Sequence, residues 1–180
     1  MFSVKLVCSL FLCLLLAGCG DNLAPSSDDK RPIVPAGSTG PAVNQKAPDF
    51  SVSDINGNTV TLASTLAGRK GAVFYFTMWC PICDTHMSNM RSSIVPLYPS
   101  VGFYLVDYVS GSVIDAANAA SSNGYAGPAF TTLADVNHIL SNNFNGTMGI
   151  TVVVDSAGIV MMNEDYKDGT RLQTTLAGLP

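Results

Sequence analysis

The feature that most constrains the fold is an apolar, aromatic run that ends in two cysteines spaced C-x-x-C. The run is Val73-Phe74-Tyr75-Phe76-Thr77-Met78-Trp79, and Cys80 and Cys83 follow it. Positions 83, 87, 90 and 94 are Cys, Met, Met and Ile, a spacing typical of one face of a helix. The pattern therefore predicts a buried strand over residues 72–77 that leads directly into a helix ending at about residue 95, before Pro96.

This arrangement gives the first cysteine a reactive position. A strand that leads directly into a helix places Cys80 at the helix N-terminus, and Pro81 then takes the first helical position. Unpaired backbone N–H groups and the helix dipole favour an anion there, and thiolate is the nucleophilic form of cysteine. Cys83 follows about one turn later, close enough to form an intramolecular disulfide. We interpret the pair as a redox-active dithiol.

Three other uses of a C-x-x-C pair are less well supported. A structural zinc site needs four ligands. Besides the two cysteines, only His86 and His138 remain as the usual zinc ligands, and their spacing matches no zinc pattern. Covalent haem attachment wants C-x-x-C-H, whereas Asp84 follows the second cysteine. A purely structural disulfide remains an alternative, although a bridge across so short a loop constrains the unfolded chain little.

The N-terminal segment predicts secretion and a lipid anchor. Lys5 precedes an apolar run over residues 6–16, which is too short to span a bilayer and fits a secretory signal. The run ends in Leu16-Ala17-Gly18-Cys19, which resembles the bacterial lipobox. We therefore expect residues 1–18 to be a removed signal peptide and Cys19 to be lipidated, which would hold the protein on a membrane. An ordinary signal peptide that happens to include Cys19 is the alternative.

Residues 19–45 are expected to separate this anchor from a folded domain. They are rich in Pro, Gly, Ser and Asp, which predicts a flexible linker, and the domain then covers residues 46–180. Gly20, rather than Asp, follows Cys19, which resembles outer-membrane sorting in Gram-negative lipoproteins. We expect a location on the periplasmic side of a bacterial cell envelope. Only Cys80 and Cys83 belong to the domain, so a disulfide-stapled scaffold is excluded.

The remaining pattern predicts alternating strands and helices. Asn56-Gly57 is a hairpin turn signal between two predicted strands, over residues 50–55 and 59–62. Further strands are predicted at 102–107, 150–154 and 159–162, and helices at 64–67, 112–122, 136–140 and 171–179. This order implies an α/β fold with a mixed central sheet, helices on both faces and an N-terminal β-hairpin. The net charge is −4 and no basic stripe is present, so nucleic-acid binding has no electrostatic support.

With these motifs in order, the chain resembles the thioredoxin superfamily, specifically the TlpA-type branch related to alkyl hydroperoxide reductase and thiol-specific antioxidant. The resemblance covers about residues 45–179. It rests on Ala47-Pro48-Asp49-Phe50, on Asn56-Gly57 with Val60 and Leu62, on the strand into Trp79-Cys80-Pro81-Ile82-Cys83, and on Val154-Asp155 with Gly158. It implies a thioredoxin-like fold in which Cys80 is the attacking thiol and Cys83 resolves the mixed disulfide.

Two positions depart from the family pattern. The family usually has a cis-proline six residues before the Asp of its hairpin, in a loop that faces the cysteines, and this position is Gly149. Thioredoxin has a buried Asp six residues before its first Cys, and this position is Phe74, so any base for Cys83 is unidentified. The candidate contacts with substrate are Trp79, Pro81, Met148 and Gly149.

Two polar residues beside the predicted site have more than one interpretation. His86 lies three residues past Cys83 on the same predicted helix, where it could tune the thiolate or simply lie exposed. Asp107 ends the predicted strand at 102–107, where it could take part in proton transfer or cap the following loop.

These features predict a membrane-tethered thiol–disulfide oxidoreductase outside the cytoplasm. Its expected partners are protein thiol or disulfide substrates and a redox partner, with no cofactor, no bound metal and no nucleic acid. A thiol peroxidase is one alternative, because Thr77 precedes Cys80 by three residues as in the peroxiredoxin pattern, although Val73 occupies its Pro position. A non-enzymatic module that binds a metal or a protein through Cys80 and Cys83 is another.

Overall fold

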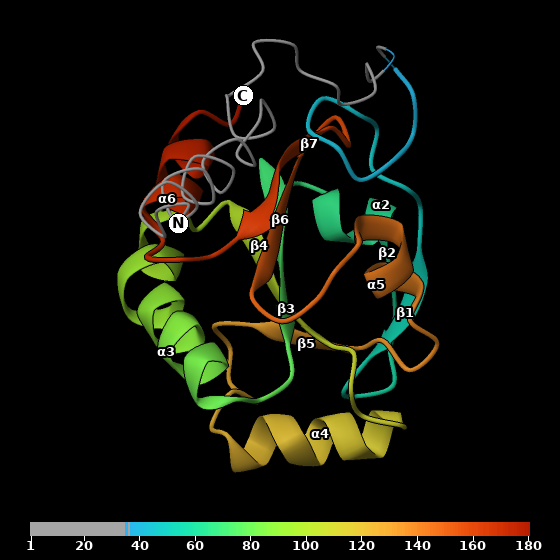
Figure 1. The fold of residues 1–180 in the computed structure, drawn as a ribbon, viewed down its shortest axis with the longest axis vertical. Coiled ribbons are helices and arrows are strands. Elements are labelled where there is room, and N and C mark those ends of the chain that lie inside the picture. The colour runs from blue at the N-terminus through green and yellow to red at the C-terminus, as the bar shows by residue number, and fades with distance from the viewer. Residues whose placement is uncertain (1–34, 36) are drawn as a thin grey trace, which may run out of the picture. The chain divides into compact units, whose positions relative to one another are not determined.

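The computed structural model describes residues 35 and 37–180 (Figure 1). The predicted signal peptide, Cys19 and most of the predicted linker lie outside the described residues. None of the helices that the structure describes is long and apolar enough to cross a bilayer. They include α2 (Leu62–Leu66), α3 (Pro81–Asn89), α4 (Val113–Ser122), α5 (Ile139–Phe144) and α6 (Thr170–Ala177).

Seven strands form one mixed sheet in the order β2-β1-β5-β4-β3-β6-β7. They are β1 (Ser51–Asp54), β2 (Thr59–Thr61), β3 (Gly71–Thr77), β4 (Val101–Asp107), β5 (Thr131–Ala134), β6 (Ile150–Asp155) and β7 (Val160–Asp165). The three central strands β3, β4 and β5 are parallel, whereas every other pairing is antiparallel. The sheet and its flanking helices confirm the predicted thioredoxin-like α/β fold with an N-terminal hairpin (Figure 1).

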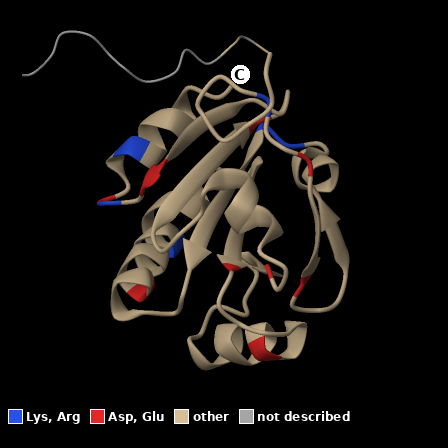
Figure 2. Cartoon of the chain, turned by 45° about the vertical axis from the view of Figure 1, so that its right-hand side comes forward, with Lys and Arg blue, Asp and Glu red and all other residues tan. Residues whose placement is uncertain are grey.

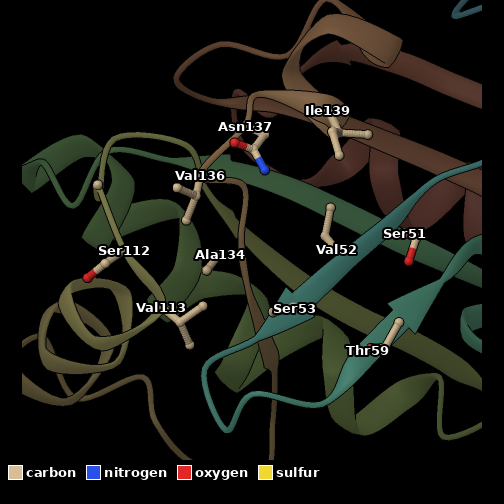
Figure 3. A pocket seen from close by; sticks show the side chains of 11 residues that line it. Ser51, Val52, Ser53, Thr59, Ser112, Val113, Ala134, Val136, Asn137 and Ile139 are labelled. Carbon is tan, nitrogen blue, oxygen red and sulfur yellow. The ribbon is translucent and has the colours of Figure 1, made fainter.

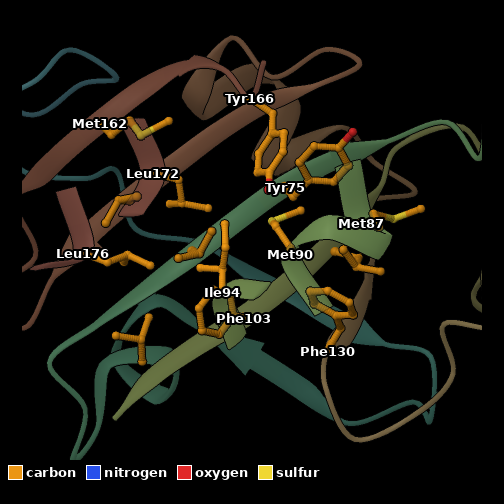
Figure 4. Close-up of a cluster of buried hydrophobic side chains, with 14 of the residues drawn as sticks. Tyr75, Met87, Met90, Ile94, Phe103, Phe130, Met162, Tyr166, Leu172 and Leu176 are labelled. Carbon is orange, nitrogen blue, oxygen red and sulfur yellow. The ribbon is translucent and has the colours of Figure 1, made fainter. Parts of the chain in front are cut away.

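The central strand β3 contributes to two separate cores, because successive residues of a strand point to opposite faces of a sheet. On one face, Val73 and Tyr75 pack with the apolar sides of α3 and α6 (Figure 4). On the other face, Phe74 and Phe76 pack with Phe144 of α5. All of β3 is buried, which explains why its sequence is nearly continuously apolar instead of alternating.

The helix after the cysteines ends less regularly than its sequence predicts. The α-helix ends at Asn89, and it continues as a π-helical turn over Met90–Ile94 and a 3-10 turn over Val95–Leu97. Pro96 lies in that last turn, because proline cannot donate the hydrogen bond that a continuing α-helix requires. The predicted apolar face is confirmed, since four side chains along it are all buried: Cys83, Met87, Met90 and Ile94.

The structure adds one strand that the sequence pattern did not predict. Strand β5 is four residues long and lies between β1 and β4, and it pairs with both. Its position depends on these neighbours more than on its own short sequence.

The predicted helix at 136–140 is also displaced, because α5 begins at Ile139. Asp135 still caps it, since its carboxylate accepts the backbone N–H of Leu140 at 3.0 Å and of Ser141 at 2.8 Å.

The chain just before residue 46, where the linker is expected to end, is hydrogen-bonded to the sheet. The Asn44 N–H donates to the Val160 carbonyl at 2.9 Å, and the Gln45 carbonyl accepts the Val160 N–H at 2.9 Å. This edge of the sheet would otherwise present unpaired backbone groups. Asn44 and Gln45 are therefore held on β7 by their backbone, immediately before the predicted start of the domain at residue 46.

Candidate thiol site

Cys80 joins strand β3 to helix α3. It is the N-cap residue of α3, and Pro81 is the first helical residue. The Cys83 backbone N–H donates to Cys80 Sγ at 3.2 Å, and the two Sγ atoms lie 2.6 Å apart as free thiols. Cys80 is partly exposed whereas Cys83 is fully buried. Only Cys80 can therefore meet a large substrate.

The two thiols differ in how readily they ionise. Burial and the hydrogen bond with Cys83 raise the pKa of Cys80, against the opposing effect of backbone N–H groups. Burial also disfavours ionisation of Cys83, but hydrogen bonds from Cys80, from backbone N–H groups and from the Thr77 hydroxyl outweigh it and lower the pKa of Cys83. The pair thus loses one proton readily and keeps the other between its sulfurs. Transfer of that proton to Cys83 leaves the thiolate on the accessible sulfur.

Trp79 holds an unusual backbone conformation immediately before the nucleophile. Its φ is +59°, in the left-handed region that bulky residues rarely adopt. Two hydrogen bonds hold it there: its backbone N–H donates to Thr77 Oγ1 at 3.0 Å, and its indole Nε1–H donates to Asp107 Oδ2 at 2.8 Å. Asp107 is buried and also accepts the backbone N–H groups of Val109 and Ser110. Of its two predicted roles, the structure therefore shows the loop cap.

The loop between α5 and β6 brings Met148 to the cysteines. Its Sδ atom lies 3.4 Å from Cys80 Sγ. Gly149, at the family's proline position, has a φ of +85°, which glycine adopts without strain. Its N–H donates to the Phe76 carbonyl at 3.0 Å and its carbonyl accepts the Tyr166 N–H at 2.9 Å. Both hydrogen-bonding groups of the Gly149 backbone are therefore already engaged within the protein.

Behind Cys83, the buried Tyr75 and the partly exposed His86 form a polar pair. The Tyr75 hydroxyl lies 3.0 Å from His86 Nδ1, and the Tyr75 ring packs edge-to-face against Tyr166, with the ring centroids 6.0 Å apart (Figure 4). Burial, followed by the charge of Cys83 and hydrogen bonding to it, raises the pKa of Tyr75. Burial lowers the pKa of His86, and Asp165 partly opposes this. The imidazole is therefore neutral near neutral pH and can accept a proton.

Three large apolar side chains are exposed beside the nucleophile, and we call them the apolar rim. Met78 is 45% exposed, Ile82 is 57% exposed and Met148 is 38% exposed. Met78 and Ile82 lie two residues before and after Cys80, and Met148 contacts it. Single exposed apolar residues are common on protein surfaces, but a group of them around a reactive atom is typical of a binding surface.

A pocket beside the N-terminal hairpin carries no comparable chemistry. Its volume is about 410 Å³, and Ser51, Ala134 and Val136 are among its lining residues (Figure 3). None of the residues that line it is titratable, and neither cysteine is among them. It therefore offers no acid, base or nucleophile.

Charged residues and metal ligands do not suggest another site. In the view of Figure 2, Lys and Arg are scattered over the described residues and form no basic stripe. Within this part of the chain, no three side chains of His, Cys, Asp or Glu come together to hold a metal ion. The soft donor atoms that could approach a metal are the sulfurs of Cys80, Cys83 and Met148.

The structure brings several predicted site residues together and adds others. Cys80, Cys83 and Met148 have their sulfur atoms in contact, Trp79 precedes them, and Pro81 begins the helix at the surface. Sequence reasoning missed two tyrosines. Tyr75 could have been found from strand alternation, which points it toward the helix that carries Cys83. Tyr108, whose pKa burial raises and the Met148 backbone partly lowers, follows a strand end and has no such signal.

Solved structures with a similar fold include redox proteins. The MTB protein DsbF, in mixed oxidized and reduced forms, is 25% identical with a TM-score of 0.59, over 73% of this chain and 95% of that one. A secreted Mycobacterium tuberculosis disulfide oxidoreductase homologous to E. coli DsbE is 21% identical with a TM-score of 0.56, over 72% and 96%. The peroxidoxin BcpB of the same organism is 17% identical with a TM-score of 0.57, over 75% and 96%.

The sequence comparisons identify the family. No curated protein sequence matches this chain. Residues 43–162, more than half of the chain, match the model of the AhpC/TSA family, and they include the strand, both cysteines and the loop that carries Met148. The fold and the thiol pair agree with this match. The chain therefore belongs to the AhpC/TSA family and has the thioredoxin-like fold of the redoxins.

Proposed function

We propose that this protein is an extracytoplasmic thiol–disulfide oxidoreductase of the TlpA type, which exchanges disulfides with protein substrates through Cys80 and Cys83. The observation that carries the proposal is the asymmetry of the thiol pair. One Sγ atom is accessible at the N-terminus of α3, and it lies 2.6 Å from a second that is fully buried. An attacking thiol needs access, and a resolving thiol needs only to reach its neighbour.

The mechanism follows from these positions. The Cys80 thiolate attacks one sulfur of a substrate disulfide, a mixed disulfide forms, and the other substrate sulfur leaves as a thiolate. Cys83 then loses its proton and attacks Cys80 Sγ, which breaks the mixed disulfide and releases the second substrate thiol. The protein ends with a Cys80–Cys83 disulfide, and the substrate has gained two electrons and two protons. The reverse sequence oxidises a substrate dithiol.

The apolar rim favours a polypeptide as the substrate. Met78, Ile82 and Met148 expose large side chains around Cys80, and methionine adapts its shape to varied apolar partners. Protein thiol or disulfide substrates fit such a surface, and the class of redox partner that restores the dithiol would use the same face. We propose Trp79 and Pro81 as further contacts with the substrate, because they flank Cys80 in the chain.

A thiol peroxidase is less well supported, although a peroxidoxin is among the proteins of similar fold. Peroxide reduction needs an activated cysteine with its own polar shell. The Thr77 hydroxyl accepts the Trp79 N–H at 3.0 Å and contributes a hydrogen bond to the buried Cys83, so it does not serve Cys80 alone. The accessible sulfur instead contacts Met148 and the Cys83 thiol.

The test compares two oxidants on the reduced full chain. Loss of free thiols is followed in parallel against a peptide disulfide and against hydrogen peroxide, and a variant with both Cys80→Ser and Cys83→Ser corrects for the three N-terminal cysteines. We expect fast exchange with the disulfide, slow reaction with peroxide, no exchange in Cys80→Ser and an accumulated mixed disulfide in Cys83→Ser. Faster reaction with peroxide would support the peroxidase instead, and no reaction with either oxidant would overturn the redox function.

A further inference from the structure

Cys83 needs a proton acceptor that the cysteine pair cannot supply. Once Cys80 forms a mixed disulfide, its sulfur is bonded to the substrate and can no longer take the Cys83 proton. Cys83 is fully buried, so water does not reach it directly. Phe74, at the position where thioredoxin has its buried acid, is fully buried in the core on the opposite face of the sheet.

The residue next to Phe74 provides a hydroxyl on the correct face. Tyr75 belongs to the same buried cluster as Cys83, between β3 and α3 (Figure 4). Its hydroxyl lies 3.0 Å from His86 Nδ1, and His86 is partly exposed on α3, three residues after Cys83. The Tyr75 hydroxyl, in the cluster that holds the buried thiol, therefore contacts a side chain that is partly exposed to solvent.

We propose that Tyr75 and His86 form a proton relay that deprotonates Cys83 in the second step of disulfide exchange. The proposal rests on the oxidoreductase function proposed above. The Cys83 thiol gives its proton to the Tyr75 oxygen while the Tyr75 hydroxyl proton passes to His86 Nδ1. The Cys83 thiolate then attacks Cys80 Sγ, and the bond between Cys80 and the substrate sulfur breaks. The imidazolium releases its other ring proton to water, and the substrate thiolate takes one up.

The groups around His86 suit a proton acceptor of this kind. Tyr75 approaches its Nδ1 atom from β3, and the Tyr166 ring lies 4.8 Å from the imidazole, centroid to centroid. Asp165, at the end of β7, is the charged group that acts on it, and the Cys83 thiol lies one turn before it on α3. Because burial outweighs the effect of Asp165, the imidazole is free to accept a proton at neutral pH.

The test separates the two steps with Ellman's reagent, an aromatic disulfide that releases one coloured thiolate per step. In stopped flow, the first release reports attack by Cys80 and the second reports attack by Cys83. The variants His86→Gln and Tyr75→Phe keep the shape of each side chain but cannot pass a proton. A matched control is His138→Asn, because the exposed His138 precedes α5 in a left-handed conformation that asparagine tolerates, and its side chain makes no cap hydrogen bond. The variant without Cys80 and Cys83 corrects for other thiols.

We expect both relay variants to slow the second release about 100-fold at neutral pH and to leave the first unchanged. In the unmodified protein, the second rate should be flat at neutral pH and fall as His86 becomes protonated. In His86→Gln it should instead rise about tenfold per pH unit, as direct ionisation of Cys83 takes over. The double variant of His86→Gln and Tyr75→Phe should have a second release little slower than either single variant, because both substitutions break the same proton path.

Three outcomes would overturn the relay. They are an unchanged second rate in either variant, equal slowing of both releases, or a pH profile in His86→Gln that matches the unmodified protein. Each would leave the oxidoreductase function intact, provided that the unmodified protein shows both releases. Absence of the second release in the unmodified protein would instead remove the proposed function itself.

Discussion

At the scale of single residues, the position of the nucleophile depends on the residue before it. Trp79 has a positive φ, so the chain turns sharply between β3 and Cys80. A conformation of this kind costs free energy and persists only where neighbouring groups enforce it. Asp107 is the main such group, because its carboxylate joins the indole of Trp79 to the loop after β4. The adjacent parallel strands β3 and β4 are thereby connected at the end of the sheet that carries the thiols.

We predict that Asp107→Ala destabilises the protein and disturbs the site. It leaves the Trp79 indole N–H and the buried loop N–H groups without an acceptor, so the free energy of unfolding should fall by about 3 kcal/mol. Trp79 is the only tryptophan, so its fluorescence in denaturant reports both unfolding and its own release. Asp165→Ala, at an exposed carboxylate that accepts no hydrogen bond within the described residues, is the control and should change stability by less than about 0.5 kcal/mol. Equal effects of the two substitutions would contradict the role of Asp107.

At the scale of elements, the strand and helix that carry the thiols were predictable, whereas the loop that faces them was only partly so. Helix periodicity and the position of Pro81 are local signals, and the structure confirms the helix start and the buried face of α3. The approach of Met148 to Cys80 depends on how β3, β6 and α5 pack, which no local pattern specifies. The resemblance alone indicated which loop would face the cysteines.

The loop that carries Met148 is fixed by a close approach between Gly146 and Phe76. A Cβ atom on Gly146 would collide with the Phe76 ring. We therefore predict that Gly146→Ala lowers the free energy of unfolding by about 2 kcal/mol, as expected for overpacking. It should also slow disulfide exchange, because Met148 shifts relative to Cys80. Gly111→Ala is the control, since nothing lies within 4 Å of its added Cβ and its φ is not positive. The measurement is the free energy of unfolding of both variants in denaturant.

The N-terminal hairpin makes a separate, pH-dependent contribution to stability. Asp54 accepts the backbone N–H groups of Asn56 and Asn58, each at 2.8 Å, across the turn between β1 and β2. Burial opposes ionisation, but hydrogen bonds from Asn58 and Asn56 together outweigh it and lower the Asp54 pKa below its usual 3.8. A lowered pKa stabilises the fold above the unfolded-state value, and this stabilisation is lost as pH falls through the folded-state value.

We accordingly predict that Asp54→Asn costs most stability at neutral pH and progressively less below about pH 4, where the carboxylate becomes protonated. The measurement is the free energy of unfolding of both proteins between about pH 7 and pH 2. A difference that stays constant through the acid range would show that the Asp54 charge does not stabilise the turn.

At the scale of the whole molecule, long-range pairing explains what the sequence could not specify. The order of strands depends on β5, which lies between β1 and β4 although its own four residues give no distinct signal. The chain just before the predicted domain shows a related effect. Residues 38–46 are rich in polar residues, yet the backbone of Asn44 and Gln45 pairs with Val160 of the edge strand β7, so their order comes from the partner rather than from their composition.

The proposed lipid anchor at Cys19 can be tested separately from the fold. We predict that Cys19→Ala abolishes incorporation of labelled palmitate and moves the protein from the membrane fraction to the soluble fraction of a bacterial host. Exchange by the purified protein should be unchanged, because Cys19 lies outside the AhpC/TSA match. Retention of the label, or of membrane association after alkaline washing, would show that Cys19 is not the anchor.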